Sequence, residues 1–217
     1  MAETVFKLNP PDLGTVEALA QFPPDADLVN PDYSGQAFSD LRWHERSYPQ
    51  VRFEMALFKN GVLSKTKLRS AVFEDVRFTA CDLSGADWSG SQLSRVEFIS
   101  SRLTGFVGAE GRYEHVLWRA CKLDYALFQM ARLTRCCFEK CDLTNATFEG
   151  ATVGHVAFRD CNLANARFVR AKLSDVDVRG SRIDGLEINL EDLRGLRIDL
   201  SQTPVIAALT RVVIDKS

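Results

Sequence analysis

Every fifth residue of this chain is large and apolar over most of its length. From Phe38 to Ile198 in steps of five there are 33 positions, and 32 of them are apolar, the exception being Gly108. Side chains recur every 3.6 residues on a helix and every two on a strand, so neither element produces a period of five. A fixed short period predicts a solenoid, whose stacked units share one core.

A second inward position, two residues before each large one, carries small side chains. Ala and Cys dominate there, and the other three positions of the unit favour Asp, Asn, Arg, Lys, Ser, Thr and Gly. Clean units read CDLSG at 81–85, CDLTN at 141–145 and CNLAN at 161–165. Turn-forming residues at the end of each unit let the chain bend every five residues.

This unit resembles that of the pentapeptide-repeat family, A(D/N)Lxx, over roughly residues 31–200. The resemblance implies an all-β fold, a right-handed quadrilateral β-helix with four units per coil, in which residues twenty apart stack. The sequence agrees, because one column of twenty is aromatic from Phe38 to Phe158 and the next is leucine from Leu63 to Leu163. With strands ~4.8 Å apart, about eight coils would make a rod roughly 40 Å long.

Residues 1–30 precede the repeat, and we expect them to form an N-terminal cap. A bare solenoid end exposes unpaired backbone groups, so the end needs a cover. The sequence from Asp12 to Phe22 predicts a short helix that stops at two prolines. Its apolar face would hold Val16, Leu19 and Ala20.

Residues 201–217 follow the repeat and predict a C-terminal helix. Ser201 would cap it, and Pro204 would lie in its first turn. Its apolar residues at helical spacing serve equally as a cap on the last coil or as a homodimer interface of the kind that family members use. These residues are Val205, Ile206, Leu209, Val212 and Val213.

The sequence contains neither a run of about 18 apolar residues nor an evident secretory signal, so we expect a cytoplasmic protein without membrane attachment. Five of the six cysteines fall in inward phases and are expected to be free core thiols. Cys137 falls in an outward phase and is expected to be the one exposed thiol. A disulfide framework or a zinc site is not expected.

We expect no catalysis, cofactor or metal. The three histidines, His44, His115 and His155, fall in outward phases on different coils. The repeat places no nucleophile beside them, although nucleophilic catalysis needs a base within hydrogen-bond reach. The sequence also lacks a phosphate-binding loop and a zinc-protease motif.

The best-known members of the family bind DNA gyrase and protect it from quinolones or other poisons. The resemblance therefore implies a non-enzymatic protein that binds DNA gyrase or topoisomerase IV through a DNA-like rod shape. The alternative is a general protein–protein interaction scaffold with an unrelated partner.

The charge of the repeat region is balanced, which slightly favours the scaffold. Residues 31–200 hold 24 basic and 23 acidic residues, and no face of the predicted rod is strongly acidic. This weakens electrostatic mimicry of DNA and equally weakens direct nucleic-acid binding. One local acidic cluster remains, formed by Glu54, Glu74 and Asp75.

Residues 104–114, TGFVGAEGRYE, contain the one break in the core phase. They predict either a thinly packed or bulged coil face or a projecting loop of the kind some gyrase-protecting members use. Outward positions nearby turn apolar, which suggests a contact surface, although packing under a loop or cap would explain them as well. The candidate partner-binding residues are Val107, Gly108, Glu110, Tyr125, Leu127 and Met130.

Overall fold

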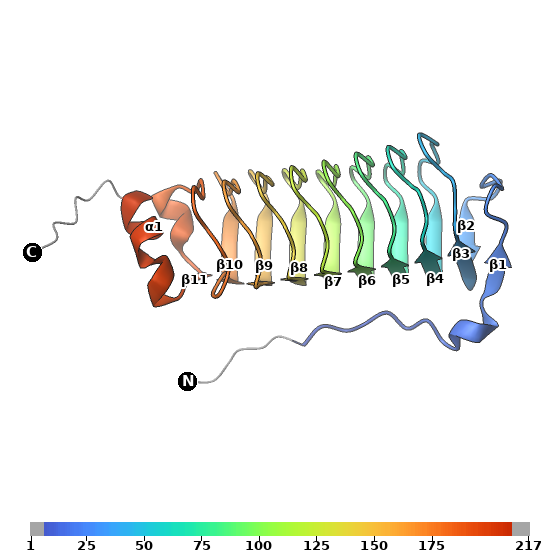
Figure 1. Ribbon diagram of the computed structural model, residues 1–217, viewed down its shortest axis with the longest axis horizontal. Coiled ribbons are helices and arrows are strands. Elements are labelled where there is room, and N and C mark those ends of the chain that lie inside the picture. The colour runs from blue at the N-terminus through green and yellow to red at the C-terminus, as the bar shows by residue number, and fades with distance from the viewer. Residues whose placement is uncertain (1–6, 210–217) are drawn as a thin grey trace, which may run out of the picture.

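Parallel strands stack one coil apart along a rod (Figure 1). This computed structural model describes residues 7–209. The strands are β1 (Ala20–Phe22), β2 (Asp32–Ser34), β3 (Gln36–Ser39), β4 (Arg52–Lys59), β5 (Val72–Thr79), β6 (Gln92–Ile99), β7 (Arg112–Arg119), β8 (Arg132–Glu139), β9 (Thr152–Arg159), β10 (Lys172–Asp177) and β11 (Leu196–Arg197). Three 3-10 turns, η1 (Val16–Ala18), η2 (Leu190–Leu193) and η3 (Leu200–Gln202), and one helix, α1 (Thr203–Leu209), lie outside the repeating coils.

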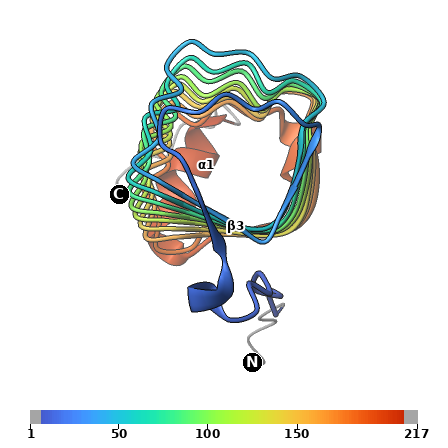
Figure 2. The ribbon, with the colours of Figure 1, turned by 90° about the vertical axis from the view of Figure 1, so that its right-hand side faces the viewer.

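The register of the sheet is one coil of twenty residues. Phe58 pairs with Phe78 between β4 and β5, and Phe78 pairs with Phe98 between β5 and β6. Viewed along the rod, the coils superimpose in a four-sided outline (Figure 2). The predicted quadrilateral β-helix is therefore confirmed.

Each corner of a coil is formed by one residue with positive φ. This conformation occurs at every fifth residue from Gly35 to Gly185, and most of these residues are not glycine; Lys65, for example, has φ 56°. A left-handed backbone costs an ordinary residue roughly 1–2 kcal/mol. Stacking holds it, because the corner N–H donates to the neighbouring coil, as from Lys65 to Ser84 O at 2.8 Å.

Aromatic rings stack in columns inside the rod, as the period of twenty predicts. The rings of Phe98, Trp118 and Phe138 are nearly parallel, with successive interplanar angles of 3° and 4°. Their centroids lie 5.8 Å and 4.3 Å apart. Ala and Cys fill the smaller inward position, so large and small side chains together exclude water from the core.

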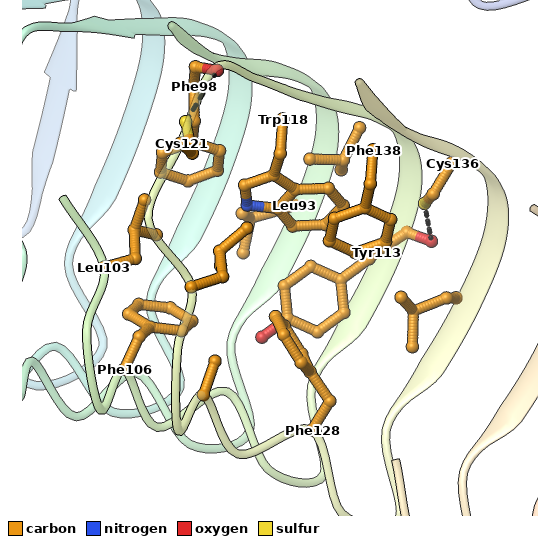
Figure 3. Close-up of a cluster of buried hydrophobic side chains, with 14 of the residues drawn as sticks. Leu93, Phe98, Leu103, Phe106, Tyr113, Trp118, Cys121, Phe128, Cys136 and Phe138 are labelled. Atoms are coloured by element: carbon orange, nitrogen blue, oxygen red, sulfur yellow. Dashed lines mark hydrogen bonds between the residues drawn. The ribbon is translucent and has the colours of Figure 1, made fainter. Parts of the chain in front are cut away.

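The core stays filled at Gly108 because two larger neighbours compensate (Figure 3). Phe106 occupies a position that usually holds Ala or Cys, and it is 1% exposed. Tyr113 is also buried, and its hydroxyl donates to Gly108 O at 3.0 Å. A Cβ at residue 108 would lie 2.2 Å from that hydroxyl oxygen. The glycine is thus required by the space that its neighbours occupy.

The predicted helix over 12–22 is wrong, since only the short turn η1 forms there. Gly14 adopts φ +57° just before η1, and β1 then pairs with β3 in parallel. Open backbone groups at the end of a solenoid outweigh a weak helical pattern, because pairing satisfies them. Phe22 of β1 covers the first coil, with its ring centroid 4.8 Å from that of Phe38.

The chain before η1 lies against the outside of the rod (Figure 1). The Asp12 N–H donates to Asp75 Oδ1 at 2.9 Å, and the Asn9 N–H donates to His115 Nδ1 at 3.2 Å. Asp75 and His115 lie two coils apart on one corner, so residues 7–15 extend along the rod. We call residues 7–15 the N-terminal strap.

The prediction of an exposed thiol at Cys137 is wrong, because this side chain is buried. Cys137 stacks outside the core between Leu117 and Ala157, and the strap residue Leu8 packs against this small cluster, as does Ile99. Burial raises the pKa of Cys137 to about 12. Leu117 and Ile99 are also outward apolar residues near residues 104–114, and packing under the N-terminal strap explains them.

The C-terminal helix forms as predicted, but the chain enters it through a 3-10 turn with a different capping residue. Asp199, not Ser201, provides the cap, and it does so for the turn η3 that leads into α1, through a reciprocal pair of hydrogen bonds with Gln202. Gln202 also donates to the Val178 and Ser181 carbonyls, each at 2.7 Å, which fixes the turn to the last coils.

Three apolar residues of the predicted stripe, Val205, Ile206 and Leu209, are half-buried and pack against the end of the core. They therefore cap the solenoid. Val212 and Val213 lie outside the described residues, and dimerisation through this stripe stays a prediction.

Candidate protein-binding surface

Each histidine is engaged by a neighbouring segment and stands apart from the other two. His44 Nδ1 lies 2.7 Å from Ser64 Oγ, and His155 Nδ1 lies 2.9 Å from Asp175 Oδ2. His115 accepts from the strap, as described above. Within residues 7–209, no three His, Cys, Asp or Glu side chains gather as a metal site would require. Over the same residues, none of the helices has the length and apolar character needed to cross a bilayer.

The inward cysteines act as small donors to the backbone. Cys121, Cys141 and Cys161 stack in one column, and each thiol lies 3.3–3.4 Å from a carbonyl oxygen of an earlier coil. All are free and buried. Burial raises the pKa of Cys81, in the same column, to about 11, which keeps that thiol protonated and unreactive at neutral pH.

The predicted acidic cluster is neutralised by arginines. Arg95 contacts Asp75 at 2.7 Å and Glu74 at 2.8 Å, while Arg52 contacts Glu74 from the other side at 2.8 Å. Burial alone would raise the pKa of Asp75, but hydrogen bonds from Arg95 and from the Asp12 N–H lower it overall. This carboxylate is thus held charged by its partners and adds little to the outward field.

Residues 104–114 form an ordinary part of the coil and do not project. Val107 bridges Asp87 on one side and Leu127 on the other, in register. The Val107 N–H donates to Ala86 O and the Leu127 N–H to Phe106 O, both at 2.8 Å. Of the two interpretations of this stretch, the projecting loop is wrong.

The structure brings four of the six candidate residues together. Val107 and Leu127 are half-buried neighbours on one face, while Tyr125 and Met130 stand on its two edges, 58% and 68% exposed. We call these four residues the central strip. Gly108 is buried beneath the face, and Glu110 lies beside Met130 on its edge.

The central strip interrupts a charged surface. Its column continues to Asp87, which pairs with Arg69 at 2.6 Å, and through Thr147 to Arg167, which pairs with Glu187 at 2.8 Å. An uncharged patch between ion pairs is suited to a protein contact, because it can be desolvated at little cost.

Beside the strip lies a row of basic residues that a charge count for the whole face conceals. Arg112 and Arg132 are direct neighbours in β7 and β8, and Lys172 follows two coils later in the same column. All three are exposed. Between Arg52 and Lys172 the acids of this face, Glu54, Glu74, Asp75 and Glu114, lie in other columns, so the balanced total conceals the row. The sequence contains a signal for this row, because its three residues are separated by multiples of twenty.

A hollow opens on the edge next to Met130. The corner residue one coil later is Gly150, and the Met130 sulfur lies 2.6 Å from where a Cβ of that residue would be. The hollow has a volume of about 560 Å³. Its lining residues are Gln129, Met130, Glu149, Gly150, Arg170 and Lys172.

Two family models match the sequence. One, described as a pentapeptide repeat region, matches residues 112–201, and the other, described as pentapeptide repeats in eight copies, matches residues 71–107. Together they cover more than half of the chain. No curated protein matches the sequence.

Solved structures resemble this chain at low identity. A trypsin-treated variant of QnrB1, a plasmid-mediated fluoroquinolone resistance protein, superimposes with a TM-score of 0.52 at 17% identity, over 85% of this chain and 99% of that one. HetL, a pentapeptide repeat protein involved in heterocyst differentiation regulation in the cyanobacterium Nostoc, gives a TM-score of 0.39 at 15% identity, over 76% and 86%. A pentapeptide repeat protein of the Arabidopsis thaliana thylakoid lumen gives 0.25 at 22% identity, over 63% and 70%.

Proposed function

This chain belongs to the pentapeptide-repeat family, and from that premise we propose that it binds DNA gyrase or topoisomerase IV, without catalysis, and protects the enzyme from a poison. The observation that carries the proposal is a straight, four-sided rod with a continuous uncharged strip at mid-length. Likeness to a fluoroquinolone resistance protein supports the choice of partner.

The proposed mechanism relies on shape and apolar contact. A rod that enters the DNA-binding channel of a topoisomerase would compete with DNA by occupying the same space. The central strip would supply the specific contact, since exposed Tyr125 and Met130 offer large side chains whose burial is favourable. Paired carboxylates elsewhere on the rod would stay hydrated.

A general protein–protein scaffold is the alternative, and ion pairing favours it. Glu139 contacts both Arg119 and Arg159, at 2.7 Å and 3.4 Å, in the same way that arginines neutralise Glu74 and Asp75. A mimic of DNA should instead present unpaired negative charge. The rod could therefore serve a partner that has no affinity for nucleic acid.

A gyrase supercoiling assay with a quinolone separates these functions. We expect near-stoichiometric protein to restore supercoiling. The double substitution Leu127→Asp/Met130→Asp should abolish the rescue, because it places two charges in the strip. The matched control Val29→Asp/Leu190→Asp adds the same charge at other exposed apolar residues, 84% and 51% exposed, and should leave the rescue intact.

Each outcome is decisive when both variants keep the thermal unfolding midpoint of the parent. Absence of rescue by the parent protein, with gyrase and with topoisomerase IV, would reject the proposed partner and leave the scaffold function. Rescue that persists in Leu127→Asp/Met130→Asp would remove the central strip from the mechanism.

A further inference from the structure

We propose that the edge of the rod at Met130 binds an acidic protein segment that also inserts an apolar side chain. We call this site the Met130 edge; it consists of Arg112, Met130, Arg132, Gly150 and Lys172. The inference rests on protein binding as the function, and it names the chemistry of the partner segment.

The basic residues of the Met130 edge lack carboxylate partners. Within residues 7–209, no Asp or Glu lies within ion-pair distance of Arg112, Arg132 or Lys172, whereas Arg52 and Arg95 on the same face each contact two carboxylates. Glu114 lies on the same coil as Arg112 but pairs with Arg135 at 3.7 Å, so Arg112, Arg132 and Lys172 keep donors available to an acidic ligand.

Arg112 and Arg132 also repel each other. They are directly opposite in adjacent parallel strands, and like charges in that arrangement are destabilising. A carboxylate bound between the two guanidinium groups would relieve the repulsion and could accept charge-assisted hydrogen bonds from both, which are stronger than neutral ones. Lys172 would hold a second acidic residue further along the same column.

The hollow supplies the apolar part of the site. Gly150 leaves the corner without a side chain, and the Met130 side chain lies over it, while Arg170 and Lys172 line the rest of the hollow. Methionine adapts its shape to an inserted group, because its side chain is unbranched and flexible. An apolar side chain in this hollow would contact Met130 while acidic neighbours reach the arginines.

A protein segment fits this site better than nucleic acid does. Nucleic acid is held by many cations along a continuous row of phosphates. Here Thr152 interrupts the basic column, and Glu110 and Glu149 lie beside the hollow. Three unpaired cations around an exposed methionine instead match a short segment that mixes acidic and apolar residues.

Fluorescence anisotropy with a labelled peptide of repeating Glu-Glu-Leu tests the site on the full chain. We expect saturable binding that weakens at least tenfold in Arg112→Ser/Arg132→Ser. The matched control Arg102→Ser/Lys122→Ser removes an equally exposed pair of adjacent cations on another face of the same coils and should bind as the parent does. A peptide with serine in place of leucine should bind the parent protein more weakly than the leucine peptide does. In Met130→Ala the affinities of the two peptides should differ less.

Three results would overturn the inference. They are absence of saturable binding, equal weakening by the two double variants, and tighter binding of a labelled DNA duplex than of the peptide. Peptide binding is measured without a topoisomerase, so it can fail while the quinolone rescue succeeds. Loss of peptide binding in Arg112→Ser/Arg132→Ser with intact rescue would assign these two arginines to the peptide site alone, with Met130 shared with the central strip.

Discussion

A single buried hydroxyl holds the irregular layer of the core together. Tyr113 donates to the carbonyl of Gly108, and its ring fills the space that the missing side chain leaves. Full burial raises the pKa of Tyr113, so the hydroxyl stays protonated and remains a donor at neutral pH. The position thus exchanges an apolar side chain for a hydrogen bond, at no loss of packing.

Gly108→Ala should destabilise the protein by about 1–3 kcal/mol, because the added methyl group overpacks the site against Tyr113 and Phe106. Tyr113→Phe removes the nearest atom and should cost about 1 kcal/mol through the lost hydrogen bond. The double variant should then be more stable than the sum of the two effects predicts. Urea unfolding of all four proteins measures this coupling, and simple additivity would contradict the proposed contact.

At the scale of elements, the backbone of the N-terminal strap donates hydrogen bonds of different chemistry to two side chains of the rod. Asp75 accepts from Asp12, and that carboxylate stays ionised to low pH because its partners lower its pKa. His115 accepts from Asn9, which requires a neutral imidazole, since a protonated ring has no free lone pair. The two ends of the strap therefore differ in their response to acid.

Burial lowers the pKa of His115, with Arg135 and Arg95 contributing and Glu114 opposing. The neutral ring is thus favoured in the folded state. The stabilisation is complete above the unfolded pKa of about 6.5 and is lost as pH falls through the lower folded value. Hydrogen exchange at the Asn9 amide, corrected for its intrinsic rate, should accelerate in that window.

Two variants control this measurement. His115→Gln keeps an acceptor that does not titrate and should abolish the acceleration. His155→Gln alters a histidine that pairs with Asp175 and does not touch the strap, so its exchange profile should follow that of the parent. An acceleration that survives His115→Gln would assign the pH response to another group.

At the scale of the whole molecule, the rod is a stack in which each coil contacts mainly its neighbours. The strand ladder from β4 to β9 repeats one register without interruption. The stability of such a solenoid is approximately a sum of coil and interface contributions. One coil can then be removed, provided that the phase of the remaining coils is kept.

Deletion of residues 132–151 removes one coil and joins two residues that keep the inward and outward phases. We expect a folded rod with cooperative thermal unfolding at a modestly lower midpoint. Deletion of residues 132–150 removes almost the same length but shifts every later core residue outward, and it should abolish cooperative unfolding. Circular dichroism during heating compares the two, and similar behaviour would contradict a phase-locked stack.

The sequence predicted what repeats and failed where contacts are not periodic. The register, the aromatic column through Trp118 and the capping helix follow from periods of five and 3.6 residues. These periods do not predict the burial of Cys137. It depends on outward apolar neighbours and on Leu8, which is distant in the sequence but packs against them. Likewise, a stretch of three glycines near Gly108 suggested a loop, whereas Phe106 fills the space.

The candidate site likewise has features that the repeat predicts and features that it does not. Stacking of Val107 on Leu127 follows from the period of twenty, and so does their exposure between charged residues. The period of twenty does not predict that Arg112 and Arg132 lack ion-pair partners. This depends on which nearby carboxylates each side chain reaches. The hollow at Gly150 also required the conformation of Met130.

The one-coil register has a consequence for how the chain reaches this structure. Strand partners along the ladder lie twenty residues apart in a chain of 217. This corresponds to a relative contact order of roughly 0.1, which is typical of helical bundles that fold in microseconds to milliseconds. Each step closes only a short loop, so the entropy lost per coil is nearly constant along the rod. A chain made almost entirely of parallel sheet should therefore fold faster than β-sandwiches of its size, and adding coils should change its folding rate little.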